Sequence, residues 1–211
     1  MDVITSILYL ASSALLYPVI IGLLVLGGTA LLEIGGLLRE LGERRANVRS
    51  WRNFQKLQTE SLTEDPALTG RNFLSSGDYT GLLRIFARCI EASAGSSLTL
   101  EKGLTDIELE AASRISRLNL FARISPMLGL AGTLIPLGPA LLGISHGDLE
   151  SLAQNLVVAF STTVLGLFAG GVFFAIGAIR RQVYAQDIAN AEFVFQCLTQ
   201  TRESEQDPAY V

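Results

Sequence analysis

Three long stretches of the chain contain no Lys, Arg, Asp or Glu, and this feature restricts its fold most strongly. They cover residues 3–32, 124–145 and 151–179. A helix rises about 1.5 Å per residue, so about 20 apolar residues are enough to cross the roughly 30 Å hydrocarbon core of a bilayer. Each stretch meets that length, and only 17% of the whole chain is charged. The sequence therefore predicts an all-α integral membrane protein with three transmembrane helices, at residues 1–32, 124–145 and 156–179.

The basic residues predict how the chain is oriented. All 16 Lys and Arg residues lie within residues 33–123 or from residue 180 onward. Because cytoplasmic segments next to membrane spans are rich in Lys and Arg, the N-terminus is expected outside and the C-terminus inside. Residues 33–123 would then form a cytoplasmic helical segment and residues 180–211 a cytoplasmic tail. Residues 146–155 would form a short external loop.

The spans are expected to continue as long helices into the cytoplasm. From residue 100 apolar residues recur at steps of three and four, which is the helical period, and no proline follows before Pro126. They are Leu100, Leu104, Ile107, Ala111, Ile115 and Leu118. The stretch after Glu33 also contains strong helix formers with alternating charges. These extensions would form a helical bundle beside the membrane.

Composition also argues against several functions. A net charge of −4 gives no basic field for binding nucleic acid, and no nucleic-acid-binding motif is present. Two cysteines and one histidine do not form a metal-ligand pattern, so no metal or cofactor is expected. The spans lack the paired acidic, Ser/His or His/Glu groups that intramembrane catalysis needs, which argues against an enzyme.

Two predicted spans carry stripes of small or kink-forming residues. Small faces let helix backbones approach closely in a bilayer, so both helices are expected to be packed against others. We expect Gly129, Gly132, Pro136, Gly166 and Gly170 to be packing residues, and we infer a homo-oligomer from the paired faces. The full stripes are Ser125, Gly129, Gly132, Thr133, Pro136, Ala140 and Gly143 in the second span, and Ala159, Thr163, Gly166, Gly170 and Gly177 in the third.

Threonines in the same spans suggest a pathway for ions. Thr133 lies near the middle of the second span, and Thr162 and Thr163 lie in the outer half of the third. Membrane threonines often only bond the carbonyl of their own preceding turn, which is the simplest interpretation. The three uncharged stretches contain no Asp, Glu, Lys, Arg or His, although such residues are typical of ion relays. If the chain serves an ion pathway, a carboxylate must therefore come from another protein.

Two sequence runs resemble a known family. Residues 125–134, SPMLGLAGTL, are similar to the signature APLLGLLGTV of the MotA/TolQ/ExbB proton-channel family, and residues 161–167, STTVLGL, resemble its T-x-x-G-L stretch. The three-span layout is closer to TolQ and ExbB than to four-span MotA. The resemblance implies a pentamer in the cytoplasmic (inner) membrane of a prokaryote. This pentamer would surround a single-span partner similar to ExbD, TolR or MotB that carries a membrane aspartate. It further implies that Thr133 and Thr163 line the ion pathway, that Thr162 flanks it, and that ion flow moves the partner.

Two positions depart from the family pattern. Val158 stands where many ExbB and TolQ chains have a glutamate, and Pro136 stands where they usually have glycine. With Pro139, Pro136 is expected to bend the second span because proline removes backbone donors. The alternative function is a membrane scaffold or assembly subunit that conducts no ions. The sequence leaves open whether the ion is H⁺ or Na⁺ and which load is driven.

Overall fold

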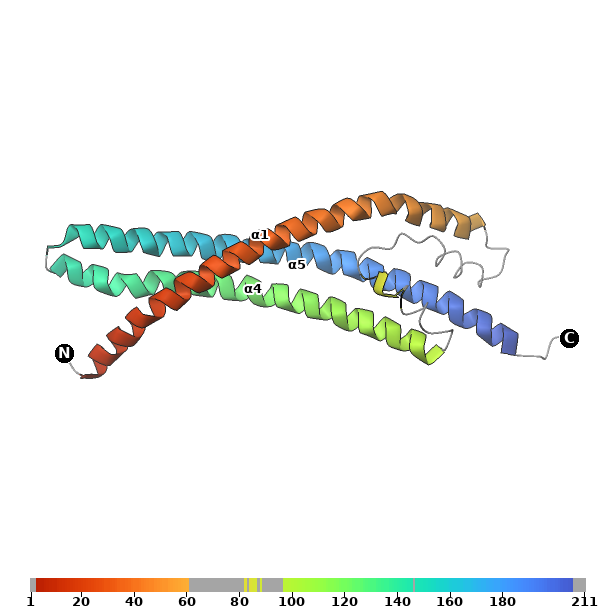
Figure 1. Cartoon of the computed structure of the whole chain (residues 1–211), viewed down its shortest axis with the longest axis horizontal. Helices are drawn as coiled ribbons and strands as arrows, with labels where there is room; N and C mark the ends of the chain where they lie inside the picture. The colour runs from red at the N-terminus through yellow and green to blue at the C-terminus, as the bar shows by residue number, and fades with distance from the viewer. Residues whose placement is uncertain are drawn as a thin grey trace. The chain divides into compact units, whose positions relative to one another are not determined.

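Three long helices make up most of the chain in the computed structural model, which describes residues 3–60, 82, 84–86, 88, 97–145 and 147–206. They are α1 (Val3–Glu60), α4 (Ser97–Ser145) and α5 (Leu149–Gln206). Over these residues the structure contains helices and no strand (Figure 1). Each of the three helices contains a segment long and apolar enough to cross a membrane: Ser13–Gly42, Glu101–Leu141 and Leu149–Gln196. The predicted all-α fold with three membrane helices is confirmed, whereas the sidedness of the termini stays a prediction.

The helices extend well beyond the uncharged stretches, as the apolar period predicted. α4 begins at Ser97, and its periodic residues Ile107, Ala111 and Leu118 are buried. α4 also continues as one helix through Pro126, Pro136 and Pro139, although each proline removes a backbone donor. Cys89 and His146 lie outside the described residues.

The chain divides into two compact units, and all three helices contribute to both. Unit 1 consists of Met1–Gly35 with Ser116–Ala178, and unit 2 of Gly36–Ile115 with Ile179–Val211. Unit 1 therefore contains all the residues that the sequence singled out as pathway or packing residues.

In unit 1, α4 and α5 form an antiparallel hairpin closed by a very short turn (Figure 1). The Gly147 amide donates to the Ile144 carbonyl (3.0 Å) and the Asp148 amide to the Gly143 carbonyl (2.9 Å), which is the Schellman pattern of a helix end. Gly147 has φ 75°, where a side chain would be strained. The Asp148 carboxylate then caps α5 by accepting from the Ser151 amide (3.0 Å). The expected loop at 146–155 is thus helical from Leu149 onward.

The unit 1 part of α1 packs across this hairpin. Its buried side chains recur at steps of three and four: Val19, Leu23, Leu26 and Ala30. A Cβ built on Gly22 would lie 3.5 Å from Leu128 of α4, and one on Gly27 would lie 3.2 Å from Leu165 of α5. Helix α1 therefore contacts both helices of the hairpin along one of its sides.

Unit 2 has its own apolar core. Seven buried residues form it: Leu82, Phe86, Ile107, Ala111, Tyr184, Ala191 and Val194. Beside this core, Arg180 of α5 pairs with Glu40 of α1, with Nε and Oε2 3.4 Å apart, and both side chains are less than one-fifth exposed. The core and the ion pair hold the extensions of all three helices together in this unit.

Candidate functional site

The closest helix contact in unit 1 is the line along which α4 meets α5, here called the α4–α5 seam. A Cβ built on Gly166 would lie 2.7 Å from the Ser125 carbonyl oxygen and 2.8 Å from Cα of Gly129. One built on Gly170 would lie 2.7 Å from Cγ of Pro126. Real Cβ atoms almost never approach other atoms this closely. Glycine is therefore required at both positions for the helices to meet as they do.

The two predicted small-residue stripes meet each other in this seam, within one subunit. On α4 the buried residues follow the predicted stripe: Ser125, Gly129, Gly132, Pro136 and Ala140. The structure thus brings Gly129 and Gly132 against α5, and Gly166 and Gly170 against α4. Because the stripes are used inside the subunit, they carry no information about an oligomer, and the inference drawn from them above loses its basis.

Thr162 is the threonine that lies inside the seam. Its side chain is 7% exposed, and a Cβ on Gly132 would lie 2.6 Å from its Oγ1 atom. The space that Gly132 leaves is therefore filled by Thr162. The sequence placed Thr163 on the packed stripe and Thr162 beside it. A helical pattern at steps of three and four that includes Thr162 would have identified it as a packed residue, because all members of that pattern are buried. They are Ala159, Thr162, Gly166, Ala169 and Phe173.

Thr133 and Thr163 lie half-buried at one edge of the seam. A Cβ built on Gly129 would lie 3.5 Å from Cα of Thr163. Thr133 follows Gly129 by four residues and so shares its helix face. On the other edge of the seam, Leu128 and Leu165 contact α1. The two predicted pathway threonines therefore border the same edge, on the side of the hairpin away from α1.

The seam hydroxyls donate their protons to carbonyls of their own helices. Thr133 donates to the Leu130 carbonyl (2.7 Å) and Thr162 to that of Ala159 (2.8 Å). Thr163 also donates to Ala159, over a longer 3.2 Å. This is the ordinary behaviour of membrane threonines. It leaves the oxygen lone pairs free to accept from a protonated carboxyl or water, and the shared acceptor makes the Thr163 proton the easiest to redirect.

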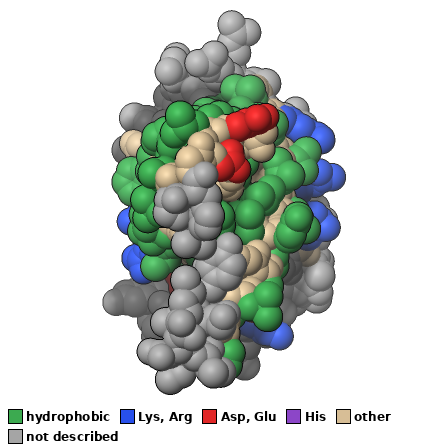
Figure 2. Space-filling view, turned by 90° about the vertical axis from the view of Figure 1, so that its left-hand side faces the viewer, with side chains coloured by type: hydrophobic (Ala, Val, Ile, Leu, Met, Phe, Trp, Pro, Cys, Tyr) green, Lys and Arg blue, Asp and Glu red, His purple; other side chains and the backbone are tan. Residues whose placement is uncertain are grey.

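No charge lies along the seam itself. Residues 124–145 and 151–178 contain no Asp, Glu, Lys, Arg or His. The described residues also contain no group of His, Cys, Asp and Glu side chains that could hold a metal ion. At the turn, exposed Asp148 and Glu150 carry negative charge, and Figure 2 shows acidic side chains at that end of the hairpin. The arrangement can solvate an ion or a carboxylate but cannot supply one.

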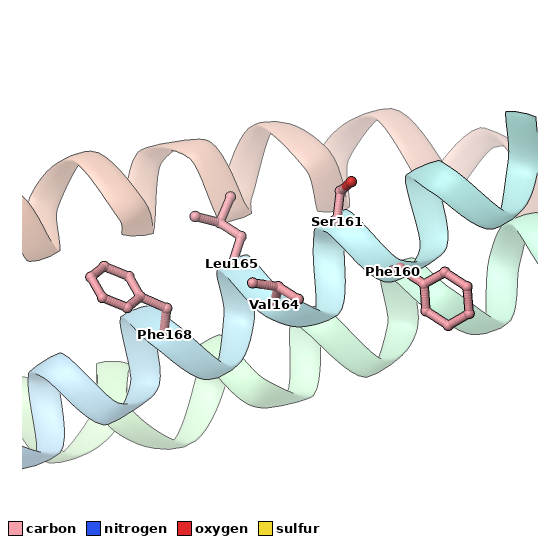
Figure 3. A pocket seen from close by; sticks show the side chains of 5 residues that line it. All are labelled: Phe160, Ser161, Val164, Leu165 and Phe168. Carbon is pink, nitrogen blue, oxygen red and sulfur yellow. The ribbon is translucent and has the colours of Figure 1, made fainter.

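A shallow groove lies on another face of α5. Phe160, Ser161, Val164, Leu165 and Phe168 line it (Figure 3). Its one polar side chain, Ser161, donates to the Val157 carbonyl (2.7 Å). The groove is therefore suited to apolar contacts and is separate from the threonine edge.

The fold and the seam define a multi-pass helical membrane protein with a neutral, hydroxyl-bordered helix hairpin. Residues 84–191 match the MotA/TolQ/ExbB proton channel family. That match covers more than half of the 211 residues and includes the whole hairpin. The chain belongs to this family, which assigns it a general ion-channel role. No curated protein and no solved structure matched the chain.

Proposed function

We propose that the chain is the ring-forming subunit of an ion-driven membrane motor. In this proposal a homo-oligomer, a pentamer as the family resemblance implies, surrounds a single-span partner of the ExbD, TolR or MotB kind in the inner membrane of a prokaryote. Ions pass at the interface between ring and partner, and their passage moves the partner. The observation that carries the proposal is the half-buried pair Thr133 and Thr163 at the open edge of a seam without charges.

The hydroxyls would act on a carboxylate that the partner supplies. An aspartate in a bilayer stays protonated unless other groups solvate its charged form, because desolvation raises the pKa of a carboxyl group. Thr133 and Thr163 could rotate their O–H groups away from the carbonyls of Leu130 and Ala159 and donate to that carboxylate. One elementary charge crossing 100 mV releases about 2.3 kcal/mol, which is enough to exchange a few hydrogen bonds of about 1 kcal/mol each.

The outer end of the pathway would depend on different groups from those common in the family. Val158 is half-buried and cannot carry charge. Asp148 and Glu150 are exposed at the turn and would raise the local cation concentration there. In this chain, attraction of the ion would thus occur at the hairpin end rather than inside the span.

The test is ion flux through the purified complex of the chain with its partner in liposomes under an imposed gradient. Thr133→Val and Thr163→Val remove the hydroxyls while nearly keeping their shape, and each should abolish or greatly reduce flux without preventing assembly. Ser161→Ala is the matched control, because Ser161 makes the same kind of carbonyl bond on another face of α5. Thr162→Val should reduce flux less than either. Normal flux in the Thr133/Thr163 double variant would reject the pathway and favour a non-conducting scaffold.

A further inference from the structure

One half-buried amide lies between the acidic turn of the hairpin and the threonines of the seam. Residues 152–160 of α5 contain only two polar side chains, those of Gln154 and Asn155. The side chain of Gln154 is exposed, whereas that of Asn155 is half-buried. On α4, residues 134–142 contain no polar side chain at all. Over this length of the hairpin, Asn155 is therefore the one half-buried polar side chain.

Asn155 lies on the side of α5 that forms the seam. At the turn end of the seam, a Cβ built on Gly143 of α4 would lie 3.7 Å from Cβ of Ser151. Asn155 and Thr163 follow Ser151 by four and twelve residues, so all three lie on one ridge of the helix surface. The helix rise places Asn155 about 10 Å from Asp148 and about 12 Å from Thr163 along the axis. The amide is thus about midway between the charged turn and the proposed pathway threonines.

The hydrogen bonds of Asn155 fix the orientation of its amide. Its Nδ2 atom donates to the Ser151 carbonyl (2.8 Å) and to Oγ of Ser151 (3.4 Å). Because a carbonyl oxygen can only accept, the amide nitrogen must face Ser151 and the amide oxygen must face away from it. In the described part of the chain, no group donates to the Asn155 Oδ1 atom. Both lone pairs of this oxygen are therefore available for a cation or its water.

We infer that Asn155 is a further residue of the ion pathway, whose amide oxygen receives the cation between the turn and Thr163. This inference rests on the proposed function. Asp148 attracts a cation at the turn, but about 22 Å of helix separate it from Thr163, and an unsolvated charge on that path costs free energy. A neutral amide oxygen can bind a sodium ion or accept from a hydronium ion without holding either by opposite charge. Asn155 would thus provide a polar step in a chain that has Val158 in place of the family's glutamate.

The test separates the amide oxygen from the amide nitrogen. The full-length chain and its partner are reconstituted in liposomes, and a membrane voltage drives flux in sodium buffer and in sodium-free buffer, which distinguishes the two ions. Asn155→Leu removes the oxygen and should lower the flux of the conducted ion about tenfold to a hundredfold, the effect of losing one hydrogen bond to a charged group. Asn155→Asp keeps an oxygen but cannot donate to the Ser151 carbonyl, and it should keep most of the flux. A structural role through the bond to Ser151 predicts instead that both variants lose flux.

Gln154→Leu is the matched control, because it removes the neighbouring amide, which also bonds four residues back, to Glu150 (3.5 Å). It should leave flux unchanged. Co-purification of the partner checks that each variant assembles, and Asn155→Ala, which also lacks the oxygen, should behave like Asn155→Leu. Unchanged flux in Asn155→Leu, or equal losses in the Leu and Asp variants, would overturn the inference and leave the proposed function standing. An unaltered complex that conducts neither ion would overturn both.

Discussion

Gly166→Ala is the sharpest test of the α4–α5 seam. The new Cβ would stand 2.7 Å from the Ser125 carbonyl oxygen, 2.8 Å from Cα of Gly129 and 3.1 Å from its amide nitrogen. All three atoms belong to the α4 backbone, so no side chain can turn aside to make room. Ordinary contact begins at 3.4 Å, and the helices must therefore separate locally by about 0.6–0.7 Å.

The free-energy change follows from that displacement. A gap of 0.5–1 Å forfeits about a quarter to a half of the dispersion energy of each contact that it opens. Insertion of a methyl group into a packed site costs about 1–3 kcal/mol. Alanine regains up to about 1 kcal/mol because it favours helix more than glycine does. We expect Gly166→Ala to lower the free energy of unfolding by about 1–2 kcal/mol.

The assay is a denaturant titration of the purified chain in mixed micelles, followed by circular dichroism. Gly171→Ala is the matched control, because it lies on the same helix and its Cβ would meet nothing within 4 Å. It should leave stability unchanged or raise it by up to about 1 kcal/mol. Gly129→Ala, whose nearest contacts are at 3.2 Å, should fall between the two. If Gly166→Ala matched Gly171→Ala, the close backbone contact would not exist in the membrane protein.

Two further outcomes can be measured on the same protein. A cysteine introduced at Arg180, in a chain whose two native cysteines are replaced, should resist labelling from outside intact cells; labelling there would reverse the proposed orientation. Gly147→Ala should lower the free energy of unfolding by about 1 kcal/mol through backbone strain alone, since its Cβ would meet nothing within 4 Å; an unchanged titration midpoint would contradict the turn geometry.

The sequence predicted the membrane helices because charge is excluded from a bilayer at every position of a span. The uncharged stretches at residues 3–32, 124–145 and 151–179 fall entirely within α1, α4 and α5. The extension of α4 down to Ser97 was also predictable, because an apolar period such as that of Ile107 and Ala111 marks a buried helix face. The absence of charge and the apolar period are both patterns over many residues, so the position of any one side chain hardly affects them.

Which individual side chains are buried in the seam was harder to predict. Thr162 and Thr163 are neighbours about 100° apart on the helix, and both can be aligned with small residues at helical steps. Packing against Gly132 decides that Thr162 is the buried one, and this contact involves a residue of another helix. For the same reason, the sequence could not show that the stripes of α4 and α5 meet within one subunit. The ion pathway through Thr133 and Thr163 stays a prediction.

The turn at Gly147 restricts which motions the hairpin can make. Two backbone hydrogen bonds close the Schellman turn, and the Asp148 cap starts α5 within the next residue, so the connection has almost no slack. Glycine backbones in contact farther along the seam leave no side-chain layer that could slide or repack. The hairpin should therefore tilt or rotate as a single rigid body, without α4 and α5 parting. Work done on this protein by an ion gradient would then have to be absorbed at the outer surfaces of the hairpin, where it meets other helices.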